Sequence, residues 1–133
     1  MSSTAQTVVP EAYHDLLAAP ALAHVATIGP GGAPQSTPVW FDWDGSRVLI
    51  GLAPDQQKLR NLRRDPRLSI SLVDPANPGR FLEIQGRAMF ESDPDRSVIT
   101  RIVAKYTGSD DLSWVDGERT IVAVEPTHAT YRR

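Results

Sequence analysis

The chain has 133 residues, 41% hydrophobic and 23% charged, a composition typical of one globular domain. Its formal net charge of −2 lacks the basic excess of general nucleic-acid binders, and without cysteine it cannot form disulfides or thiolate sites. Its three histidines are too scattered to predict a metal site. No apolar run approaches the roughly 20 residues of a membrane span, and no signal-peptide pattern occurs, so we expect a cytoplasmic protein without a membrane partner.

The first half of the chain predicts one helix and three strands. Residues 1–9 are mostly small or polar and predict a flexible N-terminal arm. A short helix is expected over residues 10–18, because Pro10 suits a first turn. Strands are predicted over residues 22–28, 33–43 and 47–52. Glycines 29, 31 and 32 mark the first turn between them, and Asp44-Gly45 predicts a tight hairpin at the second.

The second half continues this pattern. Strands are predicted over residues 68–73, 81–90, 119–125 and 129–132, with Pro126 between the last two. Gly86 predicts a bulge or bend. Residues 92–95 predict a helix start with Pro94 in the first turn, and Gly108 predicts the end of that helix. Many short strands in hairpin order, with two or three small helices, favour a closed antiparallel barrel.

The segment from Gln56 to Arg67 is the most informative part of the chain. Residues 54–67 contain five basic and two acidic side chains, a local charge of +3 in a chain of net charge −2. We expect a helix that begins here, with Asp55 as its N-cap and Lys58 at the end of the first turn. Free N–H groups, the helix dipole and the Lys58 ammonium would together form an anion site.

Three segments give the sequence a family resemblance. They are residues 26–35, with the glycine-rich turn, residues 58–67, and residues 84–88. In this order they resemble the pyridoxamine 5'-phosphate oxidase-like flavin-binding split barrels, and in particular the actinobacterial branch that uses the deazaflavin coenzyme F420. The resemblance implies a mainly β (α+β) fold over residues 10–133, a six- to seven-stranded antiparallel split β-barrel with two or three short helices. It also implies a homodimer with two cofactor sites in grooves between the subunits.

Departures from the family pattern favour the deazaflavin branch. The FMN-dependent oxidases carry an arginine and a lysine on the second barrel strand, where this chain has Ser36 and Phe41. Their phosphate-binding helix has Arg-Lys, where this chain has Gln57-Lys58, and a flavin-contacting glutamine falls near Phe81. Only the Lys58 contact carries over. The loss of two cationic partners disfavours the compact phosphate dianion of FMN.

The resemblance places the cofactor along the second strand and the basic helix. The residues expected to bind it are Gln35, Ser36, Thr37, Pro38, Gln57, Lys58, Asn61 and Arg63. Asn61 shares the helix face of Lys58. The longer phosphodiester–lactate–glutamate tail of F420 suits a spread cluster of Lys58, Arg60 and either Arg63 or Arg64. The alternatives are a solvated helix lysine, ordinary half-buried strand residues, and arginines paired with Asp65.

The expected function is an F420H2-dependent reductase that transfers hydride to a small conjugated molecule. A deazaflavin carries the hydride itself, which fits a sequence without an obvious acid–base pair, and we assign no catalytic residue or metal. The alternatives are an FMN-dependent oxidoreductase of the same fold and a non-catalytic flavin or F420 carrier. Nucleic-acid binding through the arginine-rich helix is disfavoured, because no aromatic residues interleave with it. The sequence does not name the substrate.

Overall fold

The computed structural model describes residues 8–133, so the predicted arm lies outside the described residues except at its end. Val9, which the sequence assigned to that arm, is 0% exposed and packs in the core. The predicted first helix is present as a 3-10 turn, Glu11–Tyr13, followed by α2, His14–Ala18. Tyr13, Leu16 and Leu17 bury their side chains there. The packed domain therefore begins before residue 10.

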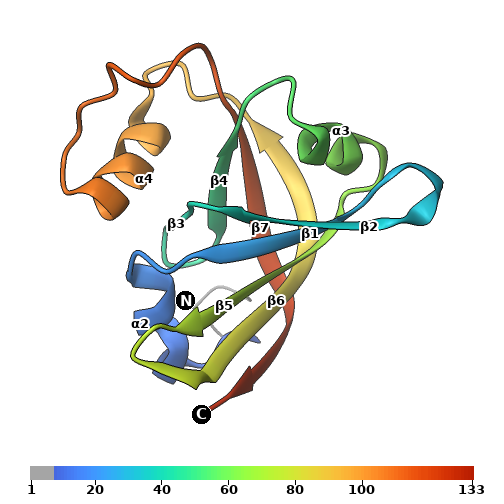
Figure 1. The fold of residues 1–133 in the computed structure, drawn as a ribbon, viewed down its shortest axis with the longest axis vertical. Helices are drawn as coiled ribbons and strands as arrows, with labels where there is room; N and C mark the ends of the chain where they lie inside the picture. Colours follow the sequence, from blue (N-terminus) through green and yellow to red (C-terminus); the bar gives the residue numbers. More distant parts are fainter. Residues whose placement is uncertain (1–7) are drawn as a thin grey trace.

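Seven antiparallel strands form one curled sheet in the order β2-β1-β5-β6-β7-β4-β3 (Figure 1). The strands are β1 (Ala23–Ile28), β2 (Pro34–Val39), β3 (Asp42–Trp43), β4 (Val48–Leu52), β5 (Arg67–Asp74), β6 (Asn77–Glu91) and β7 (Thr120–Arg132). The two edge strands, β2 and β3, follow each other in the chain with only residues 40 and 41 between them. The sheet must therefore curl until its edges meet. This confirms the mainly β, antiparallel split-barrel prediction.

Two helices flank the barrel openings and position the candidate site. Helix α3 (Gln57–Arg64) connects β4 to β5, and α4 (Ser97–Thr107) connects β6 to β7 (Figure 1). Helix α4 buries Ile99, Ile102 and Val103. Ile99 and Val103 pack on side chains of β4 and β7, forming an apolar cluster separate from the main core inside the barrel. Gly108 ends α4 with a φ of 77°, as predicted.

Several predicted boundaries were wrong. Residues 33–43 form two strands and not one, with a break at Trp40 and Phe41. The two closing strands predicted around Pro126 form one strand, β7. The pairing of β6 with β7 shifts register between Gln85 and Gly86, and this β-bulge lets the strand continue past the proline. Strand β6 starts at Asn77, before the predicted start at residue 81.

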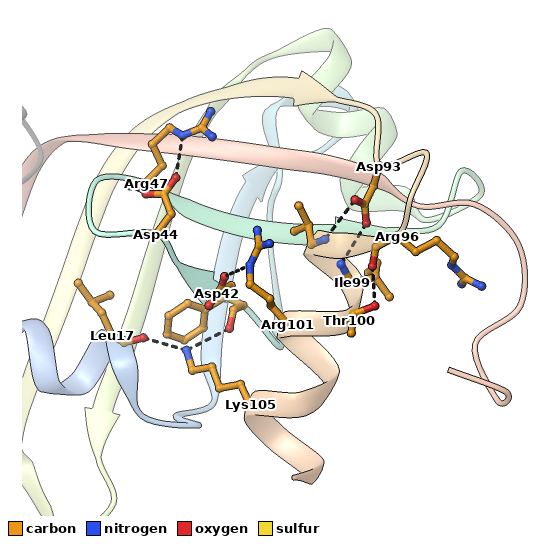
Figure 2. A network of polar contacts seen from close by, with 12 residues as sticks. Leu17, Asp42, Asp44, Arg47, Asp93, Arg96, Ile99, Thr100, Arg101 and Lys105 are labelled. Carbon is orange, nitrogen blue, oxygen red and sulfur yellow. Dashed lines mark hydrogen bonds and ion pairs between the residues drawn. The ribbon is translucent and has the colours of Figure 1, made fainter. Parts of the chain in front are cut away.

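The start of α4 also differs from the prediction. The helix begins at Ser97, so Pro94 precedes it and does not lie in its first turn. The cap comes instead from Asp93, whose carboxylate accepts hydrogen bonds from the N–H groups of Val98 at 3.1 Å and Ile99 at 3.0 Å (Figure 2).

Within residues 8–133, no helix has the length and apolar character needed to cross a membrane.

Candidate cofactor site

Helix α3 begins one residue later than the sequence predicts. Its N-cap is Gln56, not Asp55, and no side chain caps the first N–H groups. The Gln56 side chain instead accepts a hydrogen bond from the N–H of Ala53 at 3.0 Å, and the Asp55 carbonyl accepts one from Arg60 at 2.7 Å. Lys58 is consequently the second helical residue and not the last of the first turn. It lies beside the uncapped, positive end of the helix dipole.

Lys58 lines a small cavity of about 210 Å³ between β2, β4, α3 and α4. Its side chain is half-buried, and burial lowers the pKa of its ammonium group below the usual value. In the described part of the chain, no hydrogen bond or ion pair reaches this ammonium group. A desolvated cation without a partner is costly, so the site favours an anion supplied from outside.

Aromatic side chains form the other wall of this Lys58 cavity. Trp40 and Trp114 both line it, and their rings meet edge-on at a centroid distance of 6.2 Å. Trp40 also stacks on Tyr106 at 4.8 Å, with only 3° between the ring planes. The Tyr106 hydroxyl donates to the carbonyl of Ala21 at 2.6 Å, which fixes the stack. A cation on one side and flat apolar surfaces on the other suit a ligand with both an anionic group and a planar ring.

Asn61 belongs to a buried polar network and not to the cavity wall. It is 0% exposed, and its amide donates to Thr27 at 3.0 Å and Gln35 at 2.7 Å. The Gln57 side chain donates to the side-chain oxygen of Asn61 at 2.8 Å and accepts from Arg60 at 2.7 Å. These bonds join α3 to β1 and β2. Three of the predicted site residues, Gln35, Gln57 and Asn61, therefore hold the helix in place.

The remaining predicted strand residues, Ser36, Thr37 and Pro38, alternate as expected for β2. Ser36 and Pro38 are exposed, and Pro38 lines the Lys58 cavity. Thr37 turns inward, and its hydroxyl oxygen is buried without a hydrogen-bond partner in the structure. Such an orphaned hydroxyl is uncommon in native proteins and is available to a ligand or an ordered water.

The arginines of α3 and Arg67, at the start of β5, point in different directions. Arg64 donates to the carbonyl of Ile28 at 2.8 Å, and Arg67 pairs with Asp65 at 2.7 Å. The hydrogen bond from Arg67 lowers the pKa of the Asp65 carboxyl to about 2. Arg63 lies over the ring of Phe90, 4.7 Å from its centroid, and lines a second, larger cavity. Of the eight predicted site residues, only Pro38 and Lys58 line the Lys58 cavity.

Comparisons with known proteins agree with this geometry. The family model described as pyridoxamine 5'-phosphate oxidase matches residues 9–133. The chain belongs to the pyridoxamine 5'-phosphate oxidase family. It is also similar to a solved structure named an F420 reductase, with 34% identity over 92% of this chain and 98% of the other, at a TM-score of 0.80. The resemblance expected from the sequence is confirmed.

Two further solved structures show the same fold. A conserved hypothetical protein from Mycobacterium tuberculosis is 27% identical, with coverage of 93% of this chain and 84% of the other and a TM-score of 0.79. A putative pyridoxamine 5'-phosphate oxidase from Listeria innocua is 20% identical, with coverage of 83% and 86% and a TM-score of 0.63, a likeness of fold alone. The family therefore indicates an oxidoreductase with a flavin or deazaflavin cofactor.

The residues of the Lys58 cavity fit such a cofactor. Lys58 and the uncapped N–H groups of α3 match a phosphate, and Trp40 and Trp114 offer surfaces for a ring system. The wall is also shaped by Gly51, where an added Cβ would collide with Ile99. Among the described residues, no group of three or more His, Cys, Asp or Glu side chains is placed to hold a metal ion.

Sequence reasoning missed one residue near this site, Lys105. Its ammonium donates to the carbonyls of Leu17 at 2.8 Å and Phe41 at 3.0 Å and lies 3.6 Å from the centroid of the Phe41 ring (Figure 2). Burial lowers the Lys105 pKa to about 8, and the nearby Asp42 carboxylate opposes that shift. The only sequence feature that could have pointed to Lys105 was its place beside Tyr106, near the end of the helix α4.

Proposed function

We propose that the protein is an F420H2-dependent oxidoreductase that reduces a small conjugated substrate. The observation that carries the proposal is Lys58, a half-buried cation at the uncapped start of α3 that has no hydrogen-bond or ion-pair partner among residues 8–133 and faces aromatic walls across one cavity. The likeness to a protein named an F420 reductase supports the deazaflavin over other flavins.

The chain contributes binding, orientation and exclusion of water. Lys58 and the N–H groups of Gln57 and Lys58 would hold the phosphodiester of the cofactor, and Trp40 and Trp114 would orient its ring. When bound, the reduced deazaflavin supplies a hydride from C5, and a solvent proton completes the reduction of the acceptor. The cavity lining includes no carboxylate or imidazole, which agrees with a reaction that needs no general acid or base from the chain.

We also propose a homodimer whose cofactor grooves lie between subunits. Large apolar side chains that are about half or more exposed support it: Leu22 at 51%, Val73 at 50%, Met89 at 64% and Tyr131 at 48%. Sedimentation equilibrium tests this proposal, and a monomer at micromolar concentration would contradict it. The cytoplasmic location and actinobacterial source expected from the sequence remain predictions.

FMN is the second candidate cofactor, because the Lys58 contact would serve its phosphate as well. Calorimetric titration with F420 and with FMN separates the two. Micromolar binding of F420 is the expected result, whereas binding of FMN alone would overturn the proposal. A carrier role would instead give tight binding without turnover across a panel of quinones and enones.

A further inference from the structure

The two aromatic walls of the Lys58 cavity are held in place very differently. Trp40 stacks on Tyr106 with 3° between the ring planes, and the Tyr106 hydroxyl donates to the carbonyl of Ala21. The Trp114 ring has one ring contact among residues 8–133, edge-on to Trp40 at 6.2 Å, and Trp114 is 57% exposed. One wall is therefore fixed by the fold, whereas the other is free to move.

Trp114 lies on the connection between α4 and β7, residues 108–119 (Figure 1). This loop contains no helix or strand, and glycines with positive φ lie near both of its ends: Gly108 at 77° and Gly117 at 71°. A Cβ at either position would meet nothing within 4 Å, so the backbone conformation and not the packing requires glycine there. Short segments that absorb backbone rotation at both ends of a loop are typical of loops that open and close over enzyme sites.

Two guanidinium groups hold the half of this loop that follows Trp114. Arg96 donates to the carbonyls of residues 115 and 117, at 3.3 Å each. Arg119 donates to the carbonyls of residues 116 and 118. Four consecutive main-chain carbonyls after Trp114 thus accept hydrogen bonds from arginine side chains. The position of the Trp114 ring over the cavity therefore depends on these contacts.

The backbone at Arg96 is strained. Arg96 has a φ of 59°, the only positive φ among the described non-glycine residues. Such conformations persist only where the surrounding structure enforces them, and they cluster at functional sites. Here the Arg96 side chain points away from Arg101 and Lys105 of α4 (Figure 2) and reaches the loop instead. A strained residue thus holds the segment that carries Trp114.

The Lys58 cavity is small for a cofactor ring together with an acceptor. Its volume is about 210 Å³, below the roughly 300–1,000 Å³ of small-molecule sites. Next to Trp114 it is lined by the apolar side chains of Ile102, Val103 and Val115, and no carboxylate lines it. An acceptor must therefore displace part of the wall, and Trp114, on its hinged loop, is the wall residue placed to move.

We propose that Trp114 selects the acceptor and that Arg96 positions Trp114, an inference that rests on the proposed function. Rotation of the loop at Gly108 and Gly117 admits a flat, uncharged, conjugated ring, and Trp114 then closes on the face of that ring. A flat ring gains stacking contacts with an indole that a puckered ring does not. The chemical step stays as given above, with hydride from C5 and a proton from solvent. Trp114 is a specificity-determining residue, and Arg96 acts only through it.

The activity test compares a flat naphthoquinone with a puckered cyclohexenone, each reduced by the full chain with F420H2. In Trp114→Ala the ratio of their kcat/KM values should fall about tenfold, mainly through a higher KM for the naphthoquinone. Trp114→Phe, which keeps an aromatic ring, should restore most of the ratio. An unchanged ratio in Trp114→Ala would overturn the role of Trp114 and leave the F420 function standing. Reduction of neither acceptor would overturn the inference, and calorimetric titration with F420 then decides whether the proposed function fails with it.

The positioning role of Arg96 is tested without cofactor or acceptor. Arg96→Asn keeps a residue that tolerates positive φ but removes the guanidinium group. Acrylamide should quench tryptophan emission more strongly in Arg96→Asn than in the wild type, and the increase should vanish when Trp114→Phe is added. Arg101→Gln is the matched control, because Arg101 lies on α4 but pairs with Asp42 at 3.2 Å, so its quenching should match the wild type.

Urea denaturation shows that each variant is folded. Quenching in Arg96→Asn equal to that of the wild type would overturn the positioning role. An increase that persists in the absence of Trp114 would overturn it as well, because the change would then lie at another tryptophan.

Discussion

Lys58 and Lys105 are both half-buried, and burial lowers the pKa of both, yet their surroundings are opposite. Lys105 has two carbonyl acceptors and an aromatic ring face, all from the chain itself. Lys58 has no such partner in the described structure. The described chain thus supplies polar and aromatic partners to Lys105, whereas Lys58 is left open to a ligand.

The difference separates a folding role from a binding role. A cation removed from water is stable only when other groups replace its hydration. For Lys105 these groups lie in α2 and at the break between β2 and β3, so the side chain fastens α4 to the barrel. For Lys58, the proposed function supplies these groups with the cofactor, so substitution of Lys58 should weaken binding and hardly change the stability of the fold.

Lys58→Ala should produce the largest effect. It should weaken binding of F420 by about 1.5–3 kcal/mol, the value of a charge-assisted contact, while the free energy of unfolding changes by less than about 0.5 kcal/mol. Calorimetry and urea denaturation measure the two quantities. Lys58→Arg, which keeps the charge, serves as the control. Unaltered affinity in Lys58→Ala would refute the assignment.

Asn61→Ala should lower the stability of the fold more than the affinity for the cofactor, although Asn61 lies one helical turn from Lys58. Removal of this buried amide leaves the polar groups of Thr27, Gln35 and Gln57 without a partner, at a cost of about 1–3 kcal/mol in unfolding free energy. Urea denaturation with cofactor present and absent measures it. Wild-type stability combined with lost affinity would show that Asn61 contacts the cofactor directly.

The pH dependence of binding should sharpen the assignment of Lys58. Burial lowers its pKa in the free protein, and a bound anion would raise it again. Affinity should therefore be constant at low pH and fall as pH rises from the free-state pKa through the bound-state pKa. Titration between pH 7 and about 10 tests this. In Lys58→Arg, whose charge persists, the same curve should be flat, and a matching fall there would assign the effect to another group.

The smallest expected effect concerns Lys105. Its folded pKa of about 8 lies below the ordinary value of 10.5, so the unfolded chain binds more protons between these two pH values. The contribution of Lys105 to stability should therefore increase as pH rises through that window. Melting temperatures of the wild type and Lys105→Met measure it. A difference that stays constant across the window would contradict the lowered pKa.

The sequence predicted the barrel and the position of Lys58 near a helix start because both depend on local signals. Alternating apolar runs and turn glycines marked the strands, and a lysine near a helix start marked the site. The second strand was placed wrongly for a reason that lies far along the chain. At Phe41 the N–H donates to the Tyr106 hydroxyl at 3.4 Å and the carbonyl accepts from Lys105, so side chains of α4 replace the strand ladder.

The roles of Gln35, Gln57 and Asn61 could not be separated from the sequence for the same reason. Asn61 meets Thr27 and Gln35, which are 34 and 26 residues away. An amide near a predicted anion site suits a ligand contact and a structural contact equally well, and only the packed structure shows which partners it has. Arg63, which the sequence assigned to the cofactor site, lines the larger cavity, whose other lining residues come from separate segments of the chain.

The lack of a side chain at Gly86 affects more than the bulge in which it lies. A Cβ at Gly86 would meet Val124 at 2.7 Å and the carbonyl of Glu125 at 2.8 Å, within the bulge that joins β6 to β7. On the side of the bulge toward α4, β7 stays paired with β6 and pairs with β4 along its other edge, and both β6 and β7 lead into the wall of the larger cavity. Gly86 does not line the cavity, yet the space it leaves allows β6 and β7 to approach each other just before they reach that wall. A larger residue at position 86 would therefore change the shape of the cavity without changing any residue that lines it.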